Sequence, residues 1–210
     1  ASDVYKRQLV GSDSYIFDDF TKKQLDTFTR VAAELEAGLE YKVIKHILNS
    51  AGIERFTDYQ MDMVRLGIGL YGVSASGQKG LRNISTLKTT ILQIQNVPAG
   101  DSIGYSRMSY VKRDSRIAII PIGYADGLDR HFSNGGGEVV INGHRCPIIG
   151  NICMDACMID VTDTDAHEGD SVIIFGEELP VSELSDKLKT IPYEILTSIS
   201  PRVKRVYYRE

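Results

Sequence analysis

The chain has 210 residues, enough for one full domain or for one domain and part of a second. Its formal net charge of −4 provides no broad basic surface, which argues against a nucleic-acid-binding protein. The apolar runs are far shorter than the roughly 20 residues that span a bilayer, so no membrane partner is expected. Three cysteines without zinc-ligand spacing favour a reduced, cytoplasmic protein with no structural metal.

The first part of the chain alternates between helical and strand-like patterns. An apolar stripe predicts a helix from Ser12 to Gly38, with the polar residues 12–14 available as caps and the glycine as its end. We expect a strand at YKVIKHI (41–47), a turn at NSAG (49–52), a short helical piece and a second strand at DMVRLGIGLYG (62–72). This alternation is typical of the end of a βαβα series, in which the sheet is parallel.

After SASGQKG (74–80) the pattern changes to short strands separated by turns. The Asn142-Gly143 dipeptide predicts a hairpin, and one helix is expected at PVSELSDKLKT (180–190). The expected strands are TTILQIQNV (89–97), RIAIIPIGY (116–124), EVVINGHRCPIIG (138–150), ACMIDVT (156–162), SVIIFG (171–176) and RVKRVYYRE (202–210). The predicted fold is an α/β barrel fragment, its last βα units, followed by a mostly β C-terminal domain. Two βα units cannot close an eight-stranded barrel, so we expect the C-terminal portion of a longer protein.

Five residues of the first part form a candidate anion site. Ser50, Gly67 and Ile68 lie at the ends of successive predicted strands, where backbone N–H groups of α/β barrels commonly bind phosphate. Ordinary turns and a helix cap explain the same residues equally well. Arg65 lies on an apolar strand and needs a partner, either a structural carboxylate or the bound anion. His46 on the adjacent strand could reach it, although a satisfied core histidine is the commoner case.

The β part offers two candidate phenols. Tyr105 and Tyr124 each follow Ile-Gly at an expected strand end, where a tyrosine either caps a core or serves as a general acid or base. The segment GNICMDACMID (150–160) alternates like a half-buried strand, with Cys153, Asp155 and Cys157 on one side. From the residues alone, the reaction stays open.

Six motifs, taken in order, carry a resemblance. KHILNSAGIERF, DMVRLGIGLYG, IGYS, IPIGYADGLDR, IIGNICMD and YEILTSISPRVKRVY together resemble the alanine racemase family, most closely in its Bacteroidetes-type members. The resemblance covers nearly everything after residue 8. It implies that residues 1–8 are a non-native scar, 9–78 the C-terminal part of a (β/α)8 barrel that binds pyridoxal phosphate, and 79–210 the β-rich domain. It also implies a head-to-tail homodimer that interconverts L- and D-alanine for peptidoglycan synthesis.

The resemblance further implies roles for single residues. Ser50, Gly67 and Ile68 match phosphate-binding positions, and Arg65 matches the arginine that faces the pyridine nitrogen, with His46 behind it. A donor-only arginine leaves that nitrogen unprotonated, so the cofactor is a weaker electron sink.

In the β domain, Tyr105 matches the catalytic tyrosine, which the neighbouring subunit supplies in the family. Met154 matches the residue whose backbone N–H meets the substrate carboxylate. Tyr124 matches a tyrosine that lines the site.

The chain also departs from the family pattern. The family's cofactor lysine lies in an N-terminal strand motif that is absent here, and none of Lys42, Lys45, Lys79 or Lys88 stands in such a context. Pro201 replaces a tyrosine that binds phosphate in some members. The 210-residue chain alone is therefore expected to be inactive. Two alternatives stay open: a non-catalytic β-domain interaction module, and a racemase acting on another small amino acid.

Overall fold

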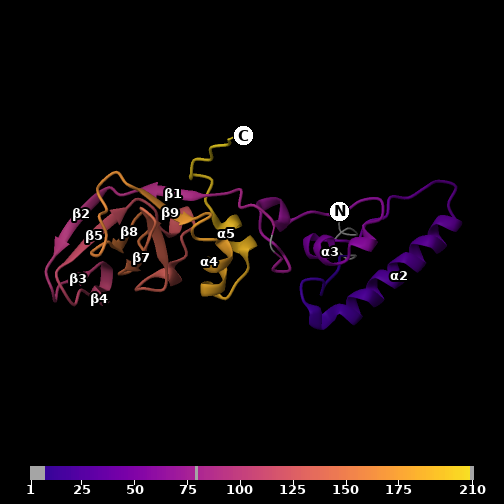
Figure 1. Ribbon diagram of the computed structural model, residues 1–210, viewed down its shortest axis with the longest axis horizontal. Coiled ribbons are helices and arrows are strands. Elements are labelled where there is room, and N and C mark those ends of the chain that lie inside the picture. Colours follow the sequence, from indigo (N-terminus) through magenta and orange to yellow (C-terminus); the bar gives the residue numbers. More distant parts are fainter. Residues whose placement is uncertain (1–7, 79, 209–210) are drawn as a thin grey trace. The chain divides into compact units, whose positions relative to one another are not determined.

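The computed structural model describes residues 8–78 and 80–208. The chain divides into two compact units, Ala1–Arg82 and Asn83–Glu210 (Figure 1). The predicted non-native segment lies outside the described residues apart from Gln8, and so does Lys79.

The first unit contains one long helix and several short helical elements. They are η1 (Tyr15–Phe17), α2 (Asp18–Ala37), α3 (Ser50–Arg55), η2 (Thr57–Tyr59) and η3 (Ile68–Tyr71). The predicted long helix is present and ends at Gly38, but it begins at Asp18 because a 3-10 turn occupies the residues before it. Of the predicted caps, Ser14 is the N-cap of η1 but makes no side-chain cap hydrogen bond, and Phe17 is the N-cap of α2. Ser12 Oγ donates to Asn49 Oδ1 at 2.8 Å instead.

The two strands predicted in this unit are not formed, and the described residues 8–78 contain no strand. The two segments nevertheless lie side by side and run in the same direction. Asp62 N donates to Lys45 O at 3.2 Å, and Arg65 N donates to Leu48 O at 2.9 Å. A strand requires a continued ladder of such bonds, so the expected parallel order is present without the expected secondary structure.

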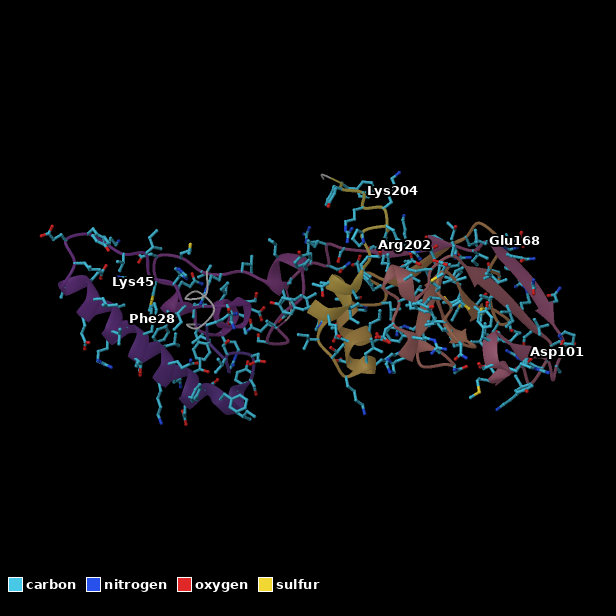
Figure 2. All side chains as sticks on the ribbon, turned by 180° about the vertical axis from the view of Figure 1, so that it is seen from behind. Phe28, Lys45, Asp101, Glu168, Arg202 and Lys204 are labelled. Atoms are coloured by element: carbon cyan, nitrogen blue, oxygen red, sulfur yellow. The ribbon has the colours of Figure 1, made fainter. Side chains whose placement is uncertain are left out.

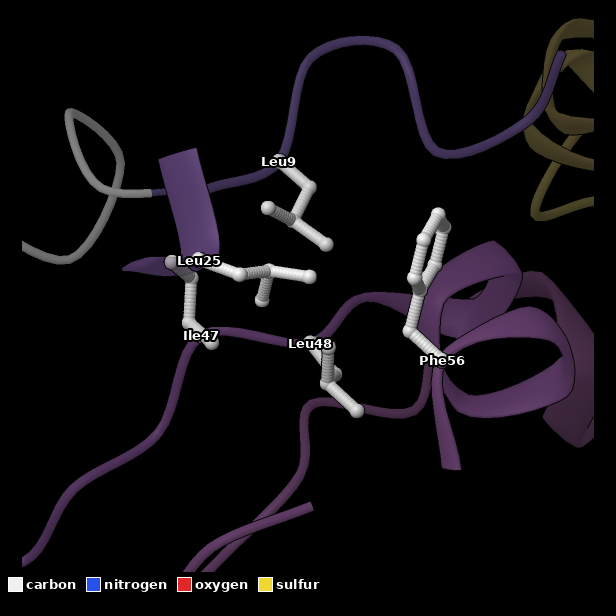
Figure 3. Close-up of a cluster of buried hydrophobic side chains, with 5 residues drawn as sticks. All are labelled: Leu9, Leu25, Ile47, Leu48 and Phe56. Carbon is white, nitrogen blue, oxygen red and sulfur yellow. The ribbon is translucent and has the colours of Figure 1, made fainter. Parts of the chain in front are cut away.

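A small apolar core holds the first unit together (Figure 3). Its buried members come from the N-terminal segment, α2, the residues before α3 and the residue after α3: Leu9, Leu25, Ile47, Leu48 and Phe56. Asn49 then caps α3, since its side-chain oxygen accepts from Gly52 N at 2.9 Å. The core and this cap together fix where α3 begins, which is the position of Ser50.

The second unit is dominated by a seven-stranded antiparallel sheet with the order β1-β9-β6-β7-β8-β5-β2. The strands are β1 (Leu87–Thr90), β2 (Gln93–Val97), β5 (Ser115–Ile120), β6 (Glu138–Ile141), β7 (His144–Ile149), β8 (Cys157–Asp160) and β9 (Ser171–Phe175), and β3 (Ser102–Ile103) pairs with β4 (Ser109–Tyr110) separately. β1 and β2 are consecutive in the chain yet lie at opposite ends of the order. The sheet therefore curls until its ends meet at Ile91 and Leu92, which splits the single strand predicted over 89–97.

The predicted hairpin is confirmed. β6 and β7 pair in register from Glu138↔Pro147 to Ile141↔His144, and Asn142 and Gly143 between them have φ of 49° and 78°. Positive φ at both central residues is the requirement of a type I′ turn. One face of the sheet carries alternate residues such as Ala118, Ile120 and Ile159 that are fully buried, and Ile117 is buried in a smaller apolar cluster on the other face.

Two helices follow the sheet, α4 (Val181–Leu188), as predicted, and α5 (Pro192–Ser198). The last predicted strand is wrong, because residues 202–208 form no strand and its remaining residues lie outside the described chain. The strand predicted over 150–160 begins only at Cys157, so Asp155 is exposed instead of sharing a face with that buried cysteine. None of the helices within 8–78 and 80–208 has the length and apolar character to cross a membrane.

Candidate functional site

The first unit joins Ser50 to the glycine-rich segment. Ser50 is the first residue of α3 and only 4% exposed, and its Oγ accepts hydrogen bonds from Gly67 N at 2.9 Å and Gly69 N at 3.4 Å. The predicted strand ends therefore meet through one buried hydroxyl. A hydroxyl in this position keeps its own proton available for donation to an anion.

The glycines leave room beside this hydroxyl. A Cβ added at Gly69 would lie 2.9 Å from Leu66 Cδ1 and 3.8 Å from Ser50 Oγ. Ile68, between the two glycines, is buried at the start of η3. The segment thus anchors itself with one apolar side chain while its backbone stays close to Ser50.

Arg65 lies on the same segment as the glycines, next to residues 46–48. Its guanidinium donates from Nη2 to Ile47 O at 3.1 Å, and its backbone N donates to Leu48 O. Burial lowers the pKa of Arg65 from its usual range. His46 lies next to Ile47, and its buried Nδ1 has no hydrogen-bond partner among residues 8–78 and 80–208. A contact between His46 and Arg65 stays a prediction.

Tyr105 lies in η4 (Tyr105–Arg107), a short turn between β3 and β4. The residue is 73% exposed, and its backbone oxygen accepts from Asn151 Nδ2 at 3.0 Å. Next to the turn lies an apolar cluster of Ile103, Val111 and Ile117, and Met158 of β8 packs against this cluster. The predicted phenol is therefore presented at the surface from a fixed base.

Tyr124 and Met154 lie together through their backbones. Tyr124 begins η5 (Tyr124–Asp126); its N donates to Cys153 O, and Ala125 N donates to Met154 O, both at 3.1 Å. A Cβ on Gly123 would lie 2.3 Å from Cys153 O, so this close approach requires a glycine. The amide N–H of Met154 has no acceptor within the described part of the chain. Met154 as a whole residue is 54% exposed.

Sequence reasoning missed the residue that ties these two segments. Arg202 donates from Nε to Asp126 Oδ1 at 2.7 Å and from Nη2 to Asp155 Oδ1 at 2.5 Å. It lies near the C-terminal end of the second unit, where Figure 2 labels it. Asp126 and Asp155 lie 76 and 47 residues before Arg202 in the chain, so no local pattern could have identified these contacts.

We call the ion pair between Asp126 and Arg202 the Asp126–Arg202 clamp. The surroundings of this pair favour the charged form of both side chains. Burial acts to raise the pKa of Asp126, but the Arg202 guanidinium and the Gly123 N–H together hold that pKa below its usual range. Hydrogen bonds to Asp126 and Asp155 raise the pKa of Arg202. Nearby, burial raises the pKa of Cys157 to about 12, which makes that thiol a poor nucleophile. No group of residues within 8–78 and 80–208 has the make-up of a metal site.

The structure therefore brings the predicted residues together in two sets. In the first unit, Ser50 and Gly67 are in direct contact, with Ile68 and Arg65 on the same segment. In the second unit, residues 151–154 connect the predicted residues. Asn151 binds the Tyr105 carbonyl, and the backbone of Cys153 and Met154 binds the segment that begins at Tyr124. The fold is part of an α/β unit joined to a curled antiparallel β unit, and each carries one set.

Comparison with known proteins identifies the family to which this chain belongs. A family model described as "Alanine racemase, C-terminal domain" matches residues 84–207, and one described as "Alanine racemase, N-terminal domain" matches residues 9–75. The chain belongs to the alanine racemase family. Its α/β unit is accordingly a portion of a barrel, followed by the family's β domain.

Individual relatives agree. "Alanine racemase 1" of Caldanaerobacter subterraneus subsp. tengcongensis is 42% identical over 199 residues, and "Alanine racemase" of Clostridium tetani is 40% identical over 202. The matches cover 90% and 91% of this chain but 51% and 52% of the relatives. The chain thus spans about half the length of the curated relatives it matches. The finer likeness to Bacteroidetes-type sequences stays a prediction.

Solved structures show the same similarity. Alanine racemase from Bartonella henselae, described with covalently bound pyridoxal phosphate, has a TM-score of 0.86 and 37% identity and is matched over 96% of this chain and 55% of its own. Alanine racemase from Bacillus anthracis, described with bound L-Ala-P, has a TM-score of 0.87 and 33% identity over 96% of this chain and 54% of its own.

Proposed function

We propose that this chain provides the C-terminal part of a pyridoxal-phosphate-dependent alanine racemase, which interconverts L- and D-alanine in the cytoplasm for peptidoglycan synthesis. The observation that carries the proposal is the exposed phenol of Tyr105, held on a supported turn beside the Met154 segment. Racemisation requires a group that handles a proton on each face of the α-carbon, and a phenol is suited to one of them.

The residues of the first unit fit the proposed cofactor. The Gly67 and Gly69 N–H groups donate to the buried Ser50 hydroxyl and so orient it, and its own proton is left to donate to a phosphate group. Arg65 fits the pyridine nitrogen, because a guanidinium donates hydrogen bonds and does not release its proton. We therefore assign Ser50, Gly67, Ile68 and Arg65 to cofactor binding, with His46 behind the arginine.

Pyridoxal phosphate, when bound, withdraws electrons from the substrate and so makes its α-proton acidic. The contribution of the second unit is to bind, orient and transfer protons. Tyr105 Oη gives or takes the α-proton on one face. The open amide N–H of Met154 binds the substrate carboxylate, and Tyr124 lines the site next to it.

The two sets of residues suggest a shared site in a dimer. We propose a head-to-tail homodimer in which Tyr105, Tyr124 and Met154 of one protomer serve the cofactor site of the other. The alternative of a non-catalytic module makes no use of an open amide beside an exposed phenol. Alanine is the favoured substrate because both structural relatives described above carry alanine racemase in their names.

A chimera tests this function. The full chain is joined behind the part of the Caldanaerobacter relative that it does not cover, and racemisation of alanine is followed by circular dichroism. We expect turnover from the chimera and none from the 210-residue chain alone. Tyr105→Phe should lower kcat by about 10²–10⁴-fold, the usual contribution of a general acid or base.

The matched control is Tyr110→Phe, which removes another exposed tyrosine hydroxyl from the adjacent strand β4. Its kcat should be that of the parent chimera. Deuterium exchange at the α-carbon adds a second readout, because loss of one face should abolish exchange from one enantiomer only. A Tyr105→Phe chimera that racemises at the parent rate would contradict the proposal.

A further inference from the structure

The backbone of the Tyr105 turn has an unusual conformation. Gly104, Ser106 and Arg107 have φ of 71°, 63° and 49°, and two of these residues are not glycine. Such conformations persist only where the surroundings hold them. The Tyr105 ring is too exposed to provide that support. The position of the phenol therefore depends on the groups that bind its backbone.

A chain of four hydrogen bonds ends on this turn. Gly150 N donates to Ser109 Oγ at 3.2 Å, and Ser109 Oγ donates to Asn134 Oδ1 at 2.7 Å. Asn134 Nδ2 donates to Asn151 Oδ1 at 3.0 Å, and Asn151 Nδ2 donates to the Tyr105 carbonyl at 3.0 Å. We call the three side chains Ser109, Asn134 and Asn151 the asparagine relay. Each accepts one bond and donates one, so the bonds polarise and strengthen one another.

The relay spans both sides of the turn. Tyr105 is the first residue of the turn and Ser109 follows it in sequence, and the three side chains of the relay connect the two. Asn134 is fixed in turn by its backbone N, which donates to Gly150 O at 3.0 Å, and its φ of 56° is one that asparagine tolerates. Opening any one of these bonds frees the turn on one side.

The relay also connects two parts of the proposed site. Asn151 lies three residues before Met154, on the segment whose backbone contacts Tyr124. Its own backbone N lies 3.4 Å from the position of a Cβ on Gly104. One amide side chain therefore sets the separation between the phenol and the amide proposed to bind the carboxylate.

We propose that Asn151, supported by Asn134 and Ser109, is a positioning residue that holds Tyr105 where it can transfer the α-proton. This inference rests on the proposed function. Asn151 need not touch the substrate; it acts through the Tyr105 carbonyl. Misplacing a reacting group by a small distance lowers the rate of the chemical step more than it weakens substrate binding.

Asn151→Asp is the sharpest variant. The carboxylate has nearly the same shape and still accepts from Asn134, but it cannot donate to the Tyr105 carbonyl. Asn83→Asp is the matched control, because Asn83 Nδ2 donates to Ser85 O at 2.9 Å in the same way elsewhere in the second unit. Ser109→Ala breaks the other end of the relay, and Ser109→Thr keeps its hydroxyl.

The first measurement is amide hydrogen exchange on the full 210-residue chain. In Asn151→Asp we expect exchange at Arg107 and Gly150 to become at least about tenfold faster, as local opening becomes easier. Exchange within β5 should not change, which separates this effect from global unfolding. Asn83→Asp should match the parent at both amides. Unchanged exchange at Arg107 in Asn151→Asp would overturn the inference.

The second measurement is kinetic and uses the chimera described above. Asn151→Asp and Ser109→Ala should each lower kcat by about tenfold or more with KM changed less than about twofold, whereas Ser109→Thr should restore the parent kcat. Faster exchange with an unchanged kcat would overturn the positioning role. An inactive parent chimera would refute the proposed function and the catalytic purpose of the relay. The exchange data would still decide separately whether Asn151 holds the turn.

Discussion

The two units of this chain differ in how completely their strand-like segments form backbone hydrogen bonds with one another. In the second unit, seven strands pair into one curled sheet whose ends meet. In the first unit, the two segments that resemble strands lie side by side without forming a strand among residues 8–78, and the unit has an apolar groove of about 640 Å³ between α2 and residues 39–47. Phe28 and Lys45 mark its two sides in Figure 2.

The difference follows from the kind of pairing that each unit uses. Antiparallel strands pair with neighbours that are close in sequence, as β6 and β7 do through their two-residue turn. Parallel strands need partners that arrive by long crossovers, and they are normally buried on both faces. The apolar stripe of α2 shows the consequence, since Phe20 and Leu35 are 52% and 51% exposed within this chain.

Amide hydrogen exchange should show the largest contrast between the units. We expect amides of β5 and β8 to exchange about 10³-fold or more slowly than those of residues 41–48 and 62–66, because the former open only with the whole sheet. The measurement uses the full chain and peptide-resolved mass spectrometry. Equal protection in both regions would break the comparison.

A matched pair of core substitutions sharpens the same contrast. Leu25 in α2 and Ile120 in β5 are both 0% exposed. Replacing either by alanine should destabilise its own unit by about 2–5 kcal/mol, the usual effect of emptying a buried aliphatic site. Thermal unfolding followed by calorimetry should then show two transitions, with Leu25→Ala moving only the first unit's and Ile120→Ala only the second's. A single transition shifted by both variants would show that the units unfold together.

The same contrast explains how much of the fold was predictable. The strands β5 to β9 and the Asn142-Gly143 hairpin were identified because their alternation and turn chemistry are local, whereas the short strands β3 and β4 were not predicted. The strands expected at 41–47 and 62–72 were wrong, because a correct strand-like pattern forms no strand without a continued ladder. The switch of pairing partner at Ile91 was also invisible, since no residue there breaks the β pattern.

The candidate site divides in the same way. Ser50, Gly67 and the two tyrosines carried local signals, a glycine-rich strand end and repeated Ile-Gly-Tyr motifs. Asn151 and Arg202 carried none, since their partners are 17 to 76 residues distant in the chain. Such residues are recognisable only once the chain has folded.

Thiol reactivity offers an intermediate effect and reports on the second unit alone, which contains all three cysteines. Burial raises the pKa of Cys146 to about 11 and that of Cys157 to about 12, whereas Cys153 is only partly buried. At pH 8 we expect one fast thiol, Cys153, and two that react at least about 10²-fold more slowly. In Leu25→Ala the two slow thiols should stay protected after the first unit has melted; their exposure in that transition would contradict independent unfolding.

The acid response of the Asp126–Arg202 clamp should be the smallest effect. A carboxyl whose pKa is lowered on folding stabilises the native state above its unfolded pKa, and this contribution is lost as the pH falls through the folded value. Asp126 is such a group, so the second unit should lose stability below about pH 4, the ordinary range of an aspartate. Asp126→Asn should be less stable at pH 7 and flatter in acid, whereas Asp165→Asn, which changes an exposed carboxylate, should follow the parent curve. An Asp126→Asn curve parallel to the parent between about pH 5 and pH 2 would mean that the clamp orients the Tyr124 and Met154 segments without stabilising the unit that carries them.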